Sequence, residues 1–365
     1  MTTTDATSPA PRDEPQGTDT LLGFAADESA PPEESKQKGW SRRRWTLTLL
    51  GLVVGLIAIV GALLGWYLRT GKPLTQLPGL AQQEKAPHYL FSMYGSTQPL
   101  GVTVSADGER IYATESGGKR VVHIYDRAGH ETGTLAPPAS TGAVHVPVYV
   151  AISPISGEIY VSDRMTSAIY VYASDGKYSR VFTPSGEAVG QWAPLGLAFD
   201  RDGRLYVTDV RGSGGHRVLV LGADGALQRT FSPTGGLLYP NGIAIDSFGH
   251  IEVSDSNNAR VMVFDADGQV LGRIVGGMGD DTLGLPRGIA VDDANRLYVV
   301  DAVNHGVRMY KVTASRTLMP AFVSSFGAEG TVDGAFEYPN GIATDSHARI
   351  YITDRENNRV QVWGY

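Results

Sequence analysis

The chain has no cysteine among its 365 residues. That absence excludes disulfide bridges, thiolate metal sites and cysteine nucleophiles. A cysteine-free chain is tolerated in either redox compartment, so the absence is compatible with an extracytoplasmic location without requiring one. Hydrophobic residues make up 42% of the chain and glycine occurs 45 times. This composition is typical of a folded, turn-rich protein.

The chain also lacks an excess of basic side chains, because its formal net charge is −7. Residues 86–365 contain 22 basic and 29 acidic side chains, so this part carries the imbalance. An acidic domain has the wrong sign for broad binding to a phosphate backbone. We therefore expect no nucleic-acid partner.

Residues 45–68 contain no charged side chain. As a helix they extend about 36 Å, enough to cross a hydrocarbon core of roughly 30 Å. Trp45, Trp66 and Tyr67 stand at the ends, where interfacial aromatic residues belong. The alternative is a cleavable signal peptide, whose apolar region covers only about 7–15 residues and ends in small residues. The longer run and the poor cleavage site after Tyr67 favour an uncleaved signal-anchor helix.

Basic residues flank this segment unevenly. Those before it are Lys36, Lys38, Arg42, Arg43 and Arg44, and those soon after it are Arg69, Lys72 and Lys85. The positive-inside rule then predicts a single-pass membrane protein with a cytoplasmic N-terminus and an extracytoplasmic C-terminal domain. Residues 1–44 are polar and rich in Pro, Thr and acidic residues, which predicts a disordered cytoplasmic tail. Residues 69–87 read as a linker.

Small residues recur along the apolar segment at Gly51, Gly55, Ala58, Ala62 and Gly65. Spacings of three and four place them on one stripe of a helix, which allows a second helix to approach closely. Helix–helix self-association is one interpretation. The other is that small residues are simply common in spanning helices.

Six similar units follow this segment. They open with Pro-x-Gly-apolar-Ala or a close variant, at Pro99, Pro147, Pro194, Pro240, Pro286 and Pro339. A period of this length marks stacked or circular repeats. Each full unit contains four short β-branched or aromatic runs separated by Asp-Gly turns, which predicts antiparallel hairpins. The expected fold is all-β, a six-bladed β-propeller of four-stranded antiparallel blades.

The last unit ends at Tyr365 after its third strand. Residues 88–95 form an orphan strand before the first unit and are similar to the fourth strand of the fifth unit. We expect them to complete the sixth blade and so to remove the exposed sheet edges of an open ring. The propeller is therefore expected to span residues 88–365.

The units resemble NHL repeats, through P-x-G-I-A, Y-V-x-D and N-R-V, best seen in residues 339–363. Blade one departs from the pattern with Glu115 in place of the aspartate, and blade two with Ala168 in place of the arginine. The repeated aspartates and arginines recur in blade after blade, whereas an active site needs one constellation. We expect them to bind loop backbone and each other.

The rim that carries the Pro-x-Gly openings varies from blade to blade, as a recognition surface does. Its polar side chains could hold a carboxylate, phosphate or sugar, with exposure to water as the plain alternative. The candidate binding residues are Arg164, Arg211, Asn241, Asn257, Arg287, Asn304, His305, Asn340, Arg355 and Asn357.

No catalytic residue, cofactor or metal site is expected. Some propeller enzymes that this architecture resembles hold zinc on three histidines or a divalent cation on carboxylates and amides, and Asn241 and Asn340 supply at most half of the second kind of site. The leading hypothesis is therefore a membrane-anchored binding, sensor or interaction module for a protein, glycan or cell-wall ligand. The alternative is a metal-dependent hydrolase or lyase with its site at the channel mouth.

Overall fold

The computed structural model describes residues 42–70, 85–138, 142–211, 215–277, 279–315, 317 and 319–365. The chain divides into two compact units on either side of residue 74. Most of the expected tail and most of the expected linker lie outside the described residues.

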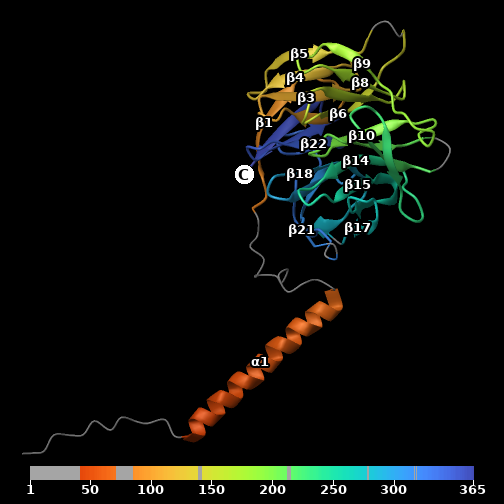
Figure 1. Cartoon of the computed structure of the whole chain (residues 1–365). Helices are drawn as coiled ribbons and strands as arrows, with labels where there is room; N and C mark the ends of the chain where they lie inside the picture. Colours follow the sequence, from red (N-terminus) through yellow and green to blue (C-terminus); the bar gives the residue numbers. More distant parts are fainter. Residues whose placement is uncertain are drawn as a thin grey trace, which may run out of the picture. The chain divides into compact units, whose positions relative to one another are not determined.

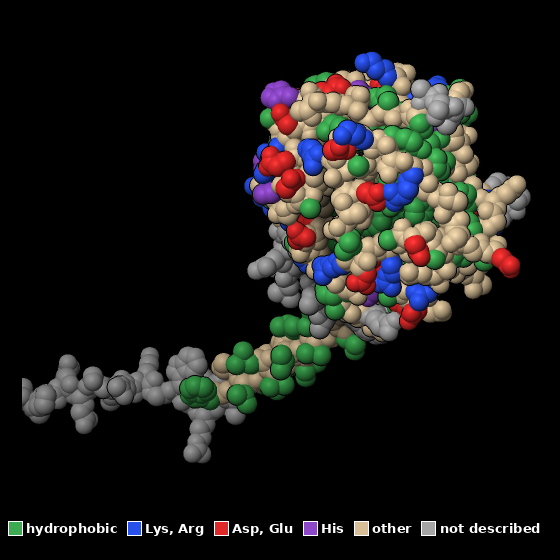
Figure 2. Space-filling model, turned by 45° about the horizontal axis from the view of Figure 1, so that its top comes forward, with side chains coloured by type: hydrophobic (Ala, Val, Ile, Leu, Met, Phe, Trp, Pro, Cys, Tyr) green, Lys and Arg blue, Asp and Glu red, His purple; other side chains and the backbone are tan. Residues whose placement is uncertain are grey.

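The first unit contains one helix, α1 (Arg42–Thr70). It extends the predicted segment at both ends, because arginine has a high helix propensity and continues the helical turn. The stretch Leu47–Gly65 has a mean hydropathy of 2.8 and none of it is buried within the chain. Figure 2 shows hydrophobic side chains along the length of this helix. By length and composition α1 can cross a membrane.

The second unit is built from 24 strands, four per blade (Figure 1). The first strands are β2 (Pro99–Val104), β6 (Pro147–Ile152), β10 (Pro194–Phe199), β14 (Pro240–Ile245), β18 (Pro286–Val291) and β22 (Pro339–Thr344). The second strands are β3 (Arg110–Glu115), β7 (Ile159–Asp163), β11 (Leu205–Asp209), β15 (Ile251–Asp255), β19 (Arg296–Asp301) and β23 (Arg349–Asp354). Each of the six openings recognised in the sequence starts a first strand.

The outer half of each blade contains the third and fourth strands. The third strands are β4 (Val122–Asp126), β8 (Ala168–Tyr172), β12 (Arg217–Leu221), β16 (Arg260–Phe264), β20 (Gly306–Lys311) and β24 (Arg359–Gly364). The fourth strands are β5 (Glu131–Leu135), β9 (Tyr178–Phe182), β13 (Leu227–Phe231), β17 (Val270–Val275), β21 (Ala321–Phe326) and, in blade six, β1 (His88–Tyr94). The 3-10 helices η3 (Ser256–Asn258) and η4 (Gly279–Asp281) lie in loops of the described residues.

The described strands form six four-stranded antiparallel sheets, and the sixth has the order β1-β24-β23-β22. β1 pairs with β24 from His88↔Gly364 to Tyr94↔Arg359, with a bulge after Tyr89. The strand that precedes the first repeat therefore completes the last blade and closes the ring. The Tyr89 ring meets Trp363 edge-to-face, with centroids 6.2 Å apart. This contact adds a local apolar anchor to the closing strand.

Hydrophobic clusters fill the spaces between neighbouring blades. Tyr206 and Val218 of blade three, for example, pack against Ile243 and Val253 of blade four. The second strands are the most deeply buried, because blades cover both of their faces. Burial of these alternating apolar side chains is what holds the ring together.

The first strands of neighbouring blades approach one another closely around the central axis. Five of the six carry glycine at the third position, and a Cβ there would overlap the backbone of the next blade. At Gly196, for example, it would overlap the carbonyl oxygen of Asn241. Blade two has Tyr149 at this position. The glycines therefore allow neighbouring first strands to approach closely, which sets how near the preceding residue of each strand lies to the axis. Blade two, with tyrosine in place of glycine, departs from this rule.

Candidate functional site

The second residue of every first strand lines one cavity of about 480 Å³ at the opening rim of the channel. These residues are Leu100, Val148, Leu195, Asn241, Arg287 and Asn340. Residues from the loops complete the wall, and among them are Gln98, Ser116, Arg164, Tyr239, Asn257 and Arg355. We call this cavity the rim pocket. Its volume suits a small molecule or one inserted side chain or sugar.

The rim pocket is lined by three arginines and by no acidic side chain. The described part of the chain is acidic overall, so this concentration of positive charge is local. Arg164 is exposed and forms no ion pair among the described residues, whereas Arg355 Nε lies 3.4 Å from Glu356 outside the wall. The pocket therefore favours an anionic group.

Arg287 is held in place by its neighbour in blade four. Its Nη1 donates to Oδ1 of Asn241 at 3.1 Å, and no carboxylate among the described residues pairs with it. Asn241 is in turn fixed, because its Nδ2 donates to Ser256 Oγ at 2.9 Å. The Arg287 guanidinium is thus oriented by a neutral amide, which leaves its charge available to a ligand.

Asn340 also makes a hydrogen bond to the neighbouring blade, since its Nδ2 donates to the carbonyl oxygen of Leu100 at 2.9 Å. The phenol of Tyr149 is buried near it, and its hydroxyl has no hydrogen-bond partner among the described residues. Burial raises the pKa of Tyr149 to about 12, although Arg287 and Asn340 act in the opposite direction. Tyr149 therefore stays protonated and offers an unused donor beside two residues of the rim pocket. Sequence reasoning missed it, although PVYVAI is the one opening without glycine.

Beyond Tyr149 the channel becomes apolar. A second cavity of about 290 Å³ is lined mainly by the later residues of the first strands, such as Val150, Ile243 and Ile289. Tyr149 lines this second cavity and not the rim pocket, and charged and amide side chains line only the rim pocket.

Six of the ten candidate residues line the rim pocket: Arg164, Asn241, Asn257, Arg287, Asn340 and Arg355. The other four do not, because blade contacts hold them. Asn304 and Asn357 donate to Asp301 and Asp354 at 2.8 and 2.9 Å, and Arg211 lies 3.3 Å from Asp209. His305 is buried and accepts the backbone N–H of Tyr338 at 3.3 Å.

The repeated aspartates act as expected, as loop anchors. Asp255 accepts the backbone N–H of Leu238 at 2.6 Å and the Arg260 Nε–H at 2.6 Å. Blade two lacks the arginine, and there His145 Nδ1 lies 3.0 Å from Asp163. A different side chain thus supplies the missing partner. These positions belong to the scaffold and not to the rim pocket.

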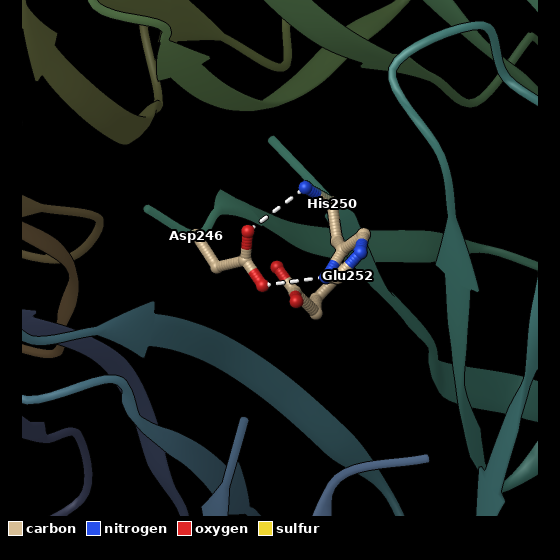
Figure 3. A group of neighbouring side chains, drawn as sticks. All are labelled: Asp246, His250 and Glu252. Atoms are coloured by element: carbon tan, nitrogen blue, oxygen red, sulfur yellow. Dashed lines mark hydrogen bonds and ion pairs between the residues drawn. The ribbon is translucent and has the colours of Figure 1, made fainter. Parts of the chain in front are cut away.

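One further group of polar side chains lies inside blade four, away from the rim pocket. Asp246, His250 and Glu252 are all buried, and their potential metal-ligand atoms lie within 4.8 Å of one another (Figure 3). Sequence reasoning did not identify this group. The signal was Glu252, the one second strand in which a glutamate replaces the tyrosine of I/L-Y.

The fold and its repeats match known proteins. A profile of the NHL repeat matches residues 192–221 and 336–363, which contain the first three strands of blade three and all but the last residue of those of blade six. The chain is a six-bladed β-propeller that contains NHL repeats. NHL repeat-containing protein 3 of Mus musculus is 26% identical over 223 residues, which cover 59% of this chain and 50% of that protein. Protein brain tumor of Drosophila melanogaster is 29% identical over 163 residues, 44% of this chain and 15% of that protein.

The chain spans half the length of the first relative and a small part of the second. Among solved structures, a gluconolactonase from Xanthomonas campestris is 18% identical, with a TM-score of 0.57 over 77% of this chain and 95% of that chain. At this identity the likeness shows the propeller fold alone. The ligand must therefore be argued from the rim pocket itself.

Proposed function

We propose that this NHL propeller is a membrane-anchored, extracytoplasmic binding module whose rim pocket captures an anionic group of a protein, glycan or cell-wall ligand. The single observation that supports the ligand class is the ring of three arginines without an acidic side chain in an otherwise acidic domain. Such a ring raises the local concentration of anionic ligands and gives carboxylates or phosphates charge-assisted hydrogen bonds.

The size of the rim pocket defines how such a ligand binds. About 480 Å³ accommodates a terminal group and not a folded partner. A macromolecular ligand would therefore insert one acidic side chain or sugar, while the loops around the mouth contact its surface. Arg287 would form the deepest ion pair, since Asn241 orients it and the Tyr149 hydroxyl lies nearby.

The experiment that tests the ligand class uses the full-length chain in detergent and two fluorescent peptides, hexaglutamate and hexaglutamine. We expect measurable binding of hexaglutamate only, weakened about 10-fold or more by Arg287→Gln, because one charge-assisted contact is worth roughly 1.5–3 kcal/mol. Arg201→Gln is the matched control, since Arg201 lies in the turn between β10 and β11. Equal weakening by both variants, or equal binding of both peptides, would reject the proposal.

The enzyme alternative receives less support from the rim pocket. Its lining residues include no histidine and no carboxylate, so they offer a metal ion only amide and hydroxyl oxygens. Catalytic metal sites usually have three histidine or carboxylate ligands. A hydrolase or lyase at this mouth would need a chemistry that these residues do not supply.

The charges that flank the apolar segment of α1 support the proposed membrane orientation. Five basic residues precede the apolar segment and three follow it, so the propeller would lie outside the cell. Because the chain has no cysteine, single introduced cysteines report topology without background labelling. In intact cells a membrane-impermeant maleimide should label Ser174→Cys in the propeller and spare Ser35→Cys in the tail. The opposite pattern would reverse the orientation.

The stripe of small residues on α1 supports self-association of the anchor. Gly51, Gly55 and Gly65 have open space where a Cβ would be, so their surface is free within this chain. A membrane two-hybrid reporter should lose signal with Gly55→Ile and keep it with Leu56→Ile. An unchanged signal for Gly55→Ile would make α1 a monomeric anchor.

A further inference from the structure

Three blades contain the same trio of buried or half-buried partners near the turn after the first strand. They are Asp200, Arg204 and Tyr206 in blade three, Asp292, Arg296 and Tyr298 in blade five, and Asp345, Arg349 and Tyr351 in blade six. The arginine Nε donates to the aspartate at 2.6 Å in blades three and five. The tyrosine hydroxyl donates to it at 2.9 and 3.0 Å in blades five and six. In this arrangement each carboxylate has a cationic partner, a phenol donor or both.

Blade four keeps the aspartate and replaces both partners. His250 stands where the arginine is, and Glu252 where the tyrosine is. Asp246 still accepts the backbone N–H groups of Phe248 and His250, both at 2.8 Å, and its Oδ2 lies 2.8 Å from His250 Nδ1. Figure 3 shows the Glu252 carboxylate directed toward Asp246. Neither oxygen of Glu252 has a hydrogen-bond partner among the described residues.

The apolar surroundings of Glu252 destabilise its charged form. Glu252 is fully buried, and its cross-strand neighbours are Ala244 on β14 and Val263 on β16. Both belong to the apolar cluster that blades four and five share, together with Leu297. Burial first, and then the charge of Asp246, raise the pKa of Glu252 well above its usual range. An unpaired carboxylate is therefore stable here only if a positive partner, a metal ion or a proton, neutralises it.

We propose that Asp246, His250 and Glu252 bind one divalent metal ion inside blade four, with Zn²⁺ the best match. Two carboxylates and a neutral imidazole balance the charge of a dication. The contact between His250 Nδ1 and Asp246 Oδ2 now requires a proton between the two atoms. A metal ion bound by both takes the place of that proton, which moves to Nε2 so that the imidazole stays neutral, while the proton that neutralises the buried Glu252 leaves to solvent.

The ligand set explains the choice of ion. Zn²⁺ binds imidazole nitrogen and carboxylate oxygen in four-coordinate sites, so three protein ligands and one water suffice. Ca²⁺ requires about six to eight oxygen ligands, and Mg²⁺ about six in near-octahedral geometry. Three buried side chains between packed sheets cannot provide that number. This site is separate from the rim pocket, and neither proposal depends on the other.

The test measures bound metal and thermal unfolding of the untagged full-length chain in detergent. After chelation, dialysis against Zn²⁺ and removal of free metal, mass spectrometry should find about one zinc per chain. Zn²⁺ at about 100 times its Kd should raise the Tm by roughly 5 °C or more, because it binds only the folded state. Mg²⁺ at the same concentration should not. A chain without bound zinc and with an unchanged Tm would overturn the proposal.

The equivalent positions of the other blades show which substitutions to test. The double variant H250R/E252Y restores the trio of the other blades, so it should fold, bind no zinc at this site and lose the Tm response. Glu252→Gln should also lose stoichiometric zinc. His130→Ala is the control, because His130 forms the same i,i+4 contact with Asp126, at 3.1 Å, on the exposed surface of blade one. Zinc retained by H250R/E252Y would place it elsewhere and reject the assignment.

Discussion

Blades three, five and six differ from blades two and four in which residue types occupy the buried positions of their first two strands. In the first set the buried aspartates have arginine, tyrosine or backbone partners, as Asp354 shows with four donors. In the second set one position departs from the repeat, and the new side chain there has a buried polar atom without a hydrogen-bond partner among the described residues. These atoms are the hydroxyl of Tyr149 in blade two and the carboxylate of Glu252 in blade four. Blades five and six also contain such atoms, Ser324 Oγ and Trp363 Nε1, so the difference between the two sets is the departure from the repeat.

A repeat protein makes such departures informative, because five copies show what the scaffold alone needs. Where the other blades have glycine, blade two inserts Tyr149, and where they have tyrosine, blade four inserts Glu252. Both choices sacrifice stability that the neighbouring blades retain, since buried polar groups are normally hydrogen-bonded. Sites where a sequence breaks its own local rules are where function is expected.

The largest effect should come from breaking a regular blade. Asp354 is fully buried and accepts the Glu337 N–H at 2.7 Å and the Arg359 Nε–H at 2.7 Å. Asp354→Ala removes the acceptor of four donors, and it leaves the buried Arg359 with only the exposed Asp333, 3.3 Å from its Nη1, as a carboxylate partner. We therefore expect a loss of about 3–5 kcal/mol in the free energy of unfolding. Chemical denaturation measures it. Asp202→Ala, at an exposed turn position, is the control and should change little; a similar loss there would contradict a local cause.

A smaller effect should come from the inner ring. Gly196→Ala places a Cβ against the carbonyl oxygen of Asn241, which must move. We expect a loss of about 1–3 kcal/mol, the usual range for overpacking. Gly235→Ala tests a different cause, because Gly235 has open space but a φ of 87°. Chemical denaturation measures the loss of stability in both variants. If Gly196→Ala and Gly235→Ala lost the same stability and both kept their affinity for hexaglutamate, close packing of the first strands would not be what holds the ring in place.

Most of the fold was predictable from the sequence because the propeller repeats its signals. Each opening proline and each Asp-Gly turn marks an element locally, so errors in one unit are corrected by five others. The incomplete last unit and the orphan strand 88–95 indicated closure for the same reason. The helix was predicted from its lack of charge, since only an uncharged run of that length can span a bilayer.

The site was less predictable, because a loop position does not reveal which contacts its side chain makes. Asn304 and Asn357 occupy loops of the variable rim, yet both turn back to a buried aspartate. Arg287 and Asn340 were easier, since their position on the first strand fixes their direction toward the axis. Glu252 required comparison across blades, and its closeness to Asp246 depends on a hairpin register that only coordinates give.

The smallest effect should distinguish an unpartnered hydroxyl from a partnered one. Tyr351 donates to Asp345 at 3.0 Å, so Tyr351→Phe should cost about 1–2 kcal/mol of stability by leaving a buried oxygen unsatisfied. Tyr149→Phe removes a hydroxyl without a partner and should be neutral or stabilising by up to about 1 kcal/mol. Its cost should appear only in hexaglutamate affinity, if the rim pocket uses that donor. A stability loss equal to that of Tyr351→Phe would show that Tyr149 is structural, and blade two would then belong with the regular blades.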